Sequence, residues 1–158
     1  MIVVSDTSPL NYLVLIQHDQ ILPALFGQVI APRGVLAELC HPNSPSEVRA
    51  WASSPPAWLE VRTPSRINPQ IKLGPGETEA LSLAQELKAD AVLIDERRGF
   101  TAAQKLGLFA TGTLGVLEVA AEKRLIRLSS AIEALQRTSF RVSDRLLREA
   151  IERDQRRS

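Results

Sequence analysis

Short runs of consecutive apolar residues alternate along the chain with longer segments in which apolar residues recur every three or four positions. The runs are rich in β-branched residues, as in Ile2–Val4, Val29–Ala31 and Ala91–Ile94, which is typical of strands buried on both faces of a sheet. The longer segments predict amphipathic helices, of which Glu77–Lys88 is the clearest. This alternation predicts an α/β fold whose central, mainly parallel sheet is flanked by helices.

The rest of the chain continues this alternation within a length of 158 residues, which fits one domain. Further strands are predicted at Trp58–Val61 and Leu108–Ala110, and Thr63–Gly76, rich in proline, glycine and polar residues, predicts a loop. A helix is predicted directly after Asp6, because Asp, Thr and Ser are helix-capping residues and Pro9 suits a first turn. Other helices are predicted at Leu22–Phe26, from Pro32 to Leu39, and at Glu47–Ala52, Gly99–Leu106, Thr113–Lys123, Ser130–Gln136 and Ser143–Asp154.

Composition limits the possible classes of protein. The only cysteine, Cys40, rules out an internal disulfide and fits a reducing, cytoplasmic compartment; beside Leu39 we expect it to be a small buried apolar side chain. No apolar stretch approaches ~20 residues, and the first residues lack the basic start of a signal peptide. The net charge of +1 does not by itself indicate a nucleic-acid-binding protein, but it is compatible with a basic surface around an acidic pocket.

Acidic residues follow two of the predicted buried strands directly. Asp6 follows the first strand at the start of a helix, and Asp95, followed by Glu96, comes after the strand Ala91–Ile94. In open parallel sheets, ligands bind outside the carboxyl ends of the strands. We therefore expect Asp6 and Asp95 to face one crevice.

Two further acids are candidates for the same crevice. Glu77 lies in the first turn of the helix that leads into the Asp95 strand, and Glu38 lies near the end of the helix after the second strand. Crowded carboxylates raise one another's free energy unless a cation lies among them. Such a cluster predicts Mg²⁺ or Mn²⁺, which prefer oxygen ligands, and hence the hydrolysis of a phosphodiester by a metal-activated water.

Each acid taken alone also has a simpler interpretation. Asp6 suits a helix N-cap, Glu77 complements a helix dipole, and Glu38 suits a solvated helix face. Glu96, followed by Arg97 and Arg98, suits a surface charge cluster. The metal-site prediction therefore rests on two acids that end buried strands, and not on any single one.

Four motifs in this order resemble the PIN-domain family, in the branch related to VapC-type toxins and to an uncharacterised PIN-like group. They are VVSDTSPL at Val3–Leu10, GPGETEA at Gly74–Ala80, LIDERR at Leu93–Arg98 and TGTLGVL at Thr111–Leu117. The resemblance covers about Ile2–Lys123. It implies a three-layer sandwich in one domain over residues 1–158, with a core of about 1–123 and a helical C-terminal extension of about 124–158.

The resemblance also implies an activity and its residues. It implies a Mg²⁺- or Mn²⁺-dependent endoribonuclease, often a homodimer and often the toxin that a small antitoxin silences. The implied catalytic acids are Asp6, Glu38, Glu77 and Asp95, and the implied metal ligands are Asp6, Asp95, Glu77 and Glu96, with the choice between Asp95 and Glu96 open. Ser8 and Thr113 match hydroxyl positions that line such sites, and we predict that Arg97 and Arg98 bind RNA.

Other interpretations remain beside this one. Ala91–Glu96 also resembles the metal-binding strand of a nucleotide hydrolase, but the chain lacks the phosphate-binding loop that such enzymes need. A PIN-like module that binds RNA or protein without cleaving it is the alternative function. At the C-terminus, an apolar stripe amid arginines suits core packing, a partner surface or phosphate contacts; the stripe comprises Leu146, Leu147, Ala150 and Ile151.

Overall fold

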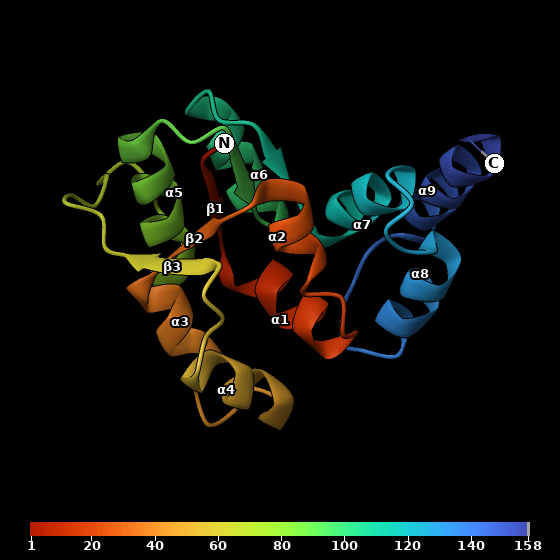
Figure 1. Ribbon diagram of the computed structural model, residues 1–158. Coiled ribbons are helices and arrows are strands. Elements are labelled where there is room, and N and C mark those ends of the chain that lie inside the picture. The colour runs from red at the N-terminus through yellow and green to blue at the C-terminus, as the bar shows by residue number, and fades with distance from the viewer. Residues whose placement is uncertain (158) are drawn as a thin grey trace.

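A five-stranded sheet, in which every strand runs parallel to its neighbours, forms the centre of the molecule (Figure 1). The computed structural model describes residues 1–157. The strands are β1 (Val3–Ser5), β2 (Val29–Pro32), β3 (Leu59–Arg62), β4 (Ala91–Leu93) and β5 (Ala110–Thr111). Their order across the sheet is β3-β2-β1-β4-β5, so the first strand of the chain lies in the middle. The predicted α/β fold with a parallel sheet is confirmed.

The helices of the described residues agree with the predicted segments to within a few residues at each end. They are α1 (Thr7–Leu15), α2 (Ile21–Phe26), α3 (Arg33–Leu39), α4 (Ser46–Ser53), α5 (Pro75–Leu87), α6 (Arg97–Lys105), α7 (Thr113–Glu122), α8 (Leu128–Gln136) and α9 (Asp144–Arg157). Helix α5 begins at Pro75, inside the segment predicted as a loop, and α8 begins at Leu128, each two residues before the predicted start. Helix α6 begins at Arg97, because Glu96 takes the N-cap position, and α9 runs on to Arg157. Within residues 1–157, no helix is both long and apolar enough to cross a membrane.

The sheet separates two apolar cores, because successive strand residues point to opposite faces. Val3 of β1 joins the core that includes residues of α1 and α7. Val4, its neighbour, joins the core formed with α5 and α6. Both valines are fully buried. Helices, sheet and helices therefore form three layers, as the predicted sandwich requires.

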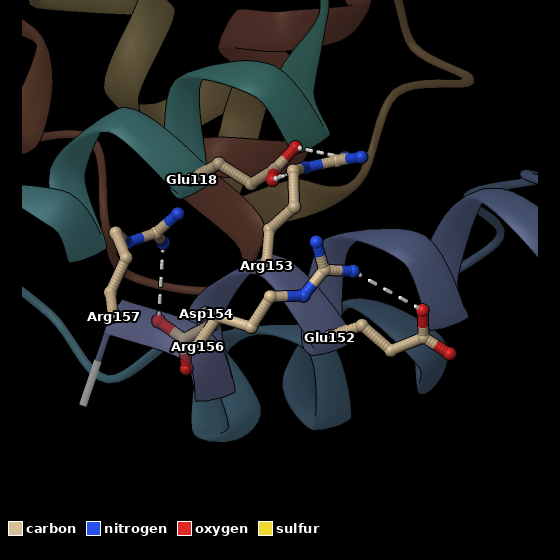
Figure 2. Close-up of polar contacts among 6 residues, drawn as sticks. All are labelled: Glu118, Glu152, Arg153, Asp154, Arg156 and Arg157. Atoms are coloured by element: carbon tan, nitrogen blue, oxygen red, sulfur yellow. Dashed lines mark hydrogen bonds and ion pairs between the residues drawn. The ribbon is translucent and has the colours of Figure 1, made fainter.

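The C-terminal helices pack on α7, at the opposite end of the molecule from α5 (Figure 1). Leu147 and Ala150 of α9 are buried in the first core, whereas Leu146 is 42% exposed. The guanidinium of Arg153 donates to both carboxylate oxygens of Glu118 on α7, at 2.8 and 3.0 Å (Figure 2). Part of the predicted apolar stripe thus serves core packing. Ser158, at the end of the predicted extension, lies outside the described residues.

Cys40 corrects one expectation from the sequence. We expected a small buried side chain next to Leu39, but the thiol is exposed. Helix α3 ends at Leu39, whose side chain is buried, and Cys40 is its C-cap residue. The chain turns away from the core at this point, so burial of one residue does not extend to the next.

Candidate metal centre

The candidate site lies at the carboxyl ends of β1 and β4. These strands are neighbours in the centre of the sheet, with Ser5 of β1 in register with Leu93 of β4. From β1 the chain continues to β2 and β3 on one side, whereas β4 leads to β5 on the other. A crevice forms where the strand order reverses in this way. Asp6 follows β1 directly, and its backbone N–H donates to the carbonyl of Leu93 at 2.8 Å.

Asp6 is the most deeply buried acid of the site, with 6% of its surface exposed. It occupies the N-cap position of α1, yet its side chain makes no capping hydrogen bond. Its Oδ1 atom is buried without a hydrogen-bond partner. Burial raises the pKa of Asp6, the backbone N–H of Thr7 partly offsets this effect, and the nearby Glu38, Asp95 and Glu96 carboxylates add to it, so that the pKa is about 6. The simple helix-cap interpretation of Asp6 therefore does not account for it.

Glu77 approaches Asp6 from the first turn of α5. Burial, together with the carboxylates of Asp6, Glu96 and Glu38, raises the pKa of Glu77 to about 7. The neighbouring Glu96 side chain contributes part of this shift. Glu77 Oε2 is buried without a hydrogen-bond partner. The site thus contains two buried carboxylate oxygens that nothing in residues 1–157 neutralises.

Asp95 has a different environment, because both of its oxygens are hydrogen-bonded to Thr113. The backbone N–H of Thr113 donates to Oδ1 at 2.6 Å, and its hydroxyl donates to Oδ2 at 2.7 Å. Burial raises the pKa of Asp95, and these two hydrogen bonds partly offset the effect. Thr113 is fully buried at the start of α7. Asp95 therefore fixes the N-terminus of α7 against the site, while Glu96 is the acid that contacts Glu77.

Glu38 reaches the same cluster from α3. Its Oε2 accepts a hydrogen bond from the hydroxyl of Thr7 at 2.7 Å, in the first turn of α1. Ser8, the hydroxyl that the resemblance implied, lies in the same turn, but no hydrogen bond joins it to these acids within the described chain. Thr7 is the hydroxyl that sequence reasoning missed, although it stands beside Asp6 in the first motif.

Three glycines provide the space in which the acids lie. A Cβ atom on Gly76 would overlap the Glu38 carboxylate, and one on Gly112 would overlap Asp95. A Cβ atom on Gly99 would overlap the Ile94 side chain and press on Glu77 Oε2. Sequence reasoning missed these positions as site residues. Gly76 and Gly112 do lie within the quoted motifs, so their position beside the acids was a usable signal.

The donor set fits a hard divalent cation. Every donor is a carboxylate or hydroxyl oxygen, and Mg²⁺ and Mn²⁺ prefer oxygen ligands. The unpartnered oxygens of Asp6 and Glu77 are the places where a cation would relieve an unfavourable burial. Within residues 1–157, no three Asp, Glu, His or Cys side chains are already grouped closely enough to hold a metal ion. Cation binding therefore has to draw the carboxylates together.

A parallel α/β sandwich with acids at the reversal of strand order fits a nuclease-like fold. The chain belongs to the PIN-domain family, whose model matches residues 2–156. PIN domains are generally nucleases and typically use divalent metals. Membership of this family suggests RNA as the substrate. Among solved structures, a PilT N-terminus domain protein from the hyperthermophilic archaeon Sulfolobus solfataricus P2 is similar, with a TM-score of 0.54 and 18% identity over 90% of this chain and 100% of that one. No curated protein matches the chain.

Proposed function

We propose that this protein is a Mg²⁺- or Mn²⁺-dependent endoribonuclease. The observation that carries the proposal is the pair of buried, unpartnered carboxylate oxygens, Asp6 Oδ1 and Glu77 Oε2, at one end of the central strands. Buried carboxylates without partners destabilise a fold, so their presence favours a role in binding a cation. The lone cysteine supports a cytoplasmic location, where thiols stay reduced.

Each acid has a distinct part in this proposal. Asp6, Glu77 and Glu96 hold the cation, and Glu38, positioned by Thr7, completes the charge around it. Asp95 positions the start of α7 through Thr113 and retains free lone pairs on both oxygens for a further contact. When bound, a divalent cation stabilises the charge on the phosphoryl oxygens and lowers the pKa of a bound water.

Asp6→Asn tests the proposal directly. A fluorescent single-stranded RNA is incubated with wild type and variant in Mn²⁺, Mg²⁺ or EDTA, and its cleavage is measured over time. We expect metal-dependent cleavage by wild type, reduced roughly 10³-fold in Asp6→Asn, because the metal contributes several kcal/mol and each 1.36 kcal/mol is tenfold in rate.

Asp154→Asn is the matched control, since it removes a carboxylate on α9 that is paired with Arg157, and it should cleave like wild type. If wild type and Asp6→Asn behave alike, the ribonuclease proposal fails. RNA binding without any cleavage would instead support the alternative, a module that has kept the fold and lost the reaction.

We further propose that the protein is the toxin of a toxin–antitoxin pair and acts as a homodimer. The PIN-domain fold supports the toxin role. The homodimer is supported by exposed apolar side chains on two packed helices, Val119 of α7 and Leu146 of α9. Induced expression should arrest growth, and co-expression of a short neighbouring reading frame should restore it. Light scattering should give twice the mass of the chain. Normal growth during expression would contradict the toxin role, and a monomeric mass would contradict the homodimer.

A further inference from the structure

A cavity of about 580 Å³ lies between the loop that precedes α5 and the exposed face of α6. Ligand pockets typically have volumes of ~300–1,000 Å³, so the cavity is large enough for a small ligand or part of a polymer. Helix α6 contributes Arg98, Thr101, Ala102 and Lys105, whose spacing places them on one face of the helix. The loop contributes residues 70–73.

Every charged side chain that lines the cavity is basic; these are Lys72, Arg97, Arg98 and Lys105. All four are exposed. Within residues 1–157 none of them forms an ion pair or a side-chain hydrogen bond. A concave surface lined by one sign of charge attracts ligands of the opposite sign. The cavity therefore suits an anion that spreads its charge over several groups.

The floor of the cavity is apolar. Its lining there comprises Ile71 and Leu73 of the loop, Ala102 of α6 and Leu106, the C-cap residue of α6. All four also pack against the second core while remaining partly exposed. Free phosphate has no apolar face to place on such a floor. An unpaired nucleotide has both parts, since its base offers a flat apolar face and its phosphates offer the charge.

Helix α6 connects the cavity to the carboxylate cluster. Arg97 directly follows Glu96, and on the same helix Gly99 provides the space beside Glu77. From Arg97 to Lys105 the helix rises roughly 12 Å at ~1.5 Å per residue. The basic residues thus begin next to the acids and lead away from them along α6.

We propose that this cavity binds single-stranded RNA immediately beside the cleavage site, with phosphates on the four basic side chains and one unpaired base on the apolar floor. The inference rests on the proposed ribonuclease function and specifies its substrate. A single strand is required because a duplex stacks its base faces inside, out of reach of the floor. The predicted role of Arg97 and Arg98 in RNA binding is part of this proposal, to which Lys72, Lys105 and the floor are added.

The test measures RNA affinity apart from cleavage. In an Asp6→Asn background with Mg²⁺, fluorescence anisotropy gives the Kd of a 5′-labelled, mixed-sequence single-stranded 12-nucleotide RNA at several salt concentrations. We expect Arg98→Ala combined with Lys105→Ala to raise Kd at least about tenfold. The slope of log K against log salt should fall by roughly 1.4, because each phosphate contact on a single strand contributes ~0.7.

A matched double variant, Arg141→Ala with Arg148→Ala, removes two exposed arginines from the C-terminal region and should leave both Kd and the slope unchanged. Arg98→Lys with Lys105→Arg keeps the charge and should largely restore binding. Thermal melting verifies that each variant is folded. Leu106→Ser should weaken binding to the single strand without changing the salt slope.

Several results would overturn the inference. They are no measurable binding by the parent at 50 mM salt, equal binding by the Arg98/Lys105 variant, equal binding of a 12-base-pair RNA duplex, and displacement of the RNA by polyglutamate at equal charge. Failure of the ribonuclease proposal gives a different result. In that case wild type does not cleave RNA in Mn²⁺, yet the cavity variants still lose affinity while the control variant does not.

Discussion

Carboxylates gather in two regions of the molecule, and only one region supplies them with basic partners. On α7 and α9, Arg153 binds both oxygens of Glu118, and Arg157 lies 3.3 Å from Asp154 (Figure 2). At the ends of β1 and β4, Asp6 and Glu77 lie among other acids. The two regions contain the same kind of side chain in opposite electrostatic settings.

The direction of the pKa shifts shows what the difference means. Beside Glu118 the pKa of Arg153 is raised, so the pair is stable in its charged form. The pKa values of Asp6 and Glu77 are also raised, but there the shift means that the charged form is unfavourable. Charges on α9 therefore support the fold. Charges at the carboxyl ends of β1 and β4 reduce its stability unless a cation binds. Under the proposed function, the comparison separates carboxylates that stabilise the fold from carboxylates that would bind a cation.

Asp6→Asn should give the largest effect on stability, and its sign is unusual for a change at a buried site. The pKa of Asp6 rises from 3.8 to about 6, and one unit corresponds to 1.36 kcal/mol. The variant should therefore raise the free energy of unfolding of the metal-free protein at pH 7.5 by up to about 3 kcal/mol. Urea unfolding in EDTA measures it, and a variant less stable than wild type would contradict the comparison.

The pH dependence of stability follows from the same shifts. A folded state with a raised carboxyl pKa binds its proton more tightly than the unfolded chain, so its extra stability is present at low pH and is lost as pH rises. The loss should occur between about pH 4 and pH 7, the window set by Asp6 and Glu77. In EDTA, wild type should lose stability across this window and Asp6→Asn should lose less. Mn²⁺ at 100 times its Kd should restore about 2.7 kcal/mol at pH 7.5 in wild type.

Gly76→Ala tests whether the space around the acids matters for the metal. The new methyl group would overlap the Glu38 carboxylate and displace it. We expect Mn²⁺ affinity to fall about tenfold or more, as for other changes that disturb the support of a metal ligand. Gly74→Ala is the matched control, because its Cβ would lie 3.6 Å from Glu77, an ordinary contact. Isothermal titration measures both, and equal affinities would show that Glu38 adapts freely.

Glu118→Gln should give a small effect of the opposite sign from Asp6→Asn. It neutralises a carboxylate in the same way, but this carboxylate has a partner in Arg153. The exposed position of Arg153 limits the loss to roughly 0.2–1 kcal/mol of unfolding free energy. Arg156→Ala, which removes a longer and fully exposed contact at 3.7 Å, should change stability even less. A stabilising effect of Glu118→Gln in urea unfolding would remove the distinction between the two regions.

Much of the fold was predictable because it depends on local periodicity. The runs that contain Val3, Ile30 and Val92 form the neighbouring central strands. Their parallel pairing alone places Asp6 and Asp95 at the same end of the sheet. The engagement of both Asp95 oxygens by Thr113 was not predictable. It depends on how α7 docks 18 residues further along the chain, which no local pattern records.

The other features missed from the sequence have the same origin. Gly99 matters because α6 packs close to Glu77, and Lys72 meets Lys105 at one cavity because a loop folds over a helix. Each depends on tertiary packing between segments whose patterns are ordinary. The open choice between Asp95 and Glu96 was of this kind, since adjacent residues in a sequence point in different directions only once the backbone is fixed.

The central position of β1 has a consequence for the order of events during synthesis. Chains emerge from the ribosome N-terminal end first, so β1, β2 and β3 are available before β4 and α5. Asp6 meets the Leu93 carbonyl and the Glu77 carboxylate only after most of the chain has been made. Until then the half-built sheet lacks the surroundings that a cation requires. Under the proposed ribonuclease function, this delay would keep the nascent chain inert beside the messenger that encodes it.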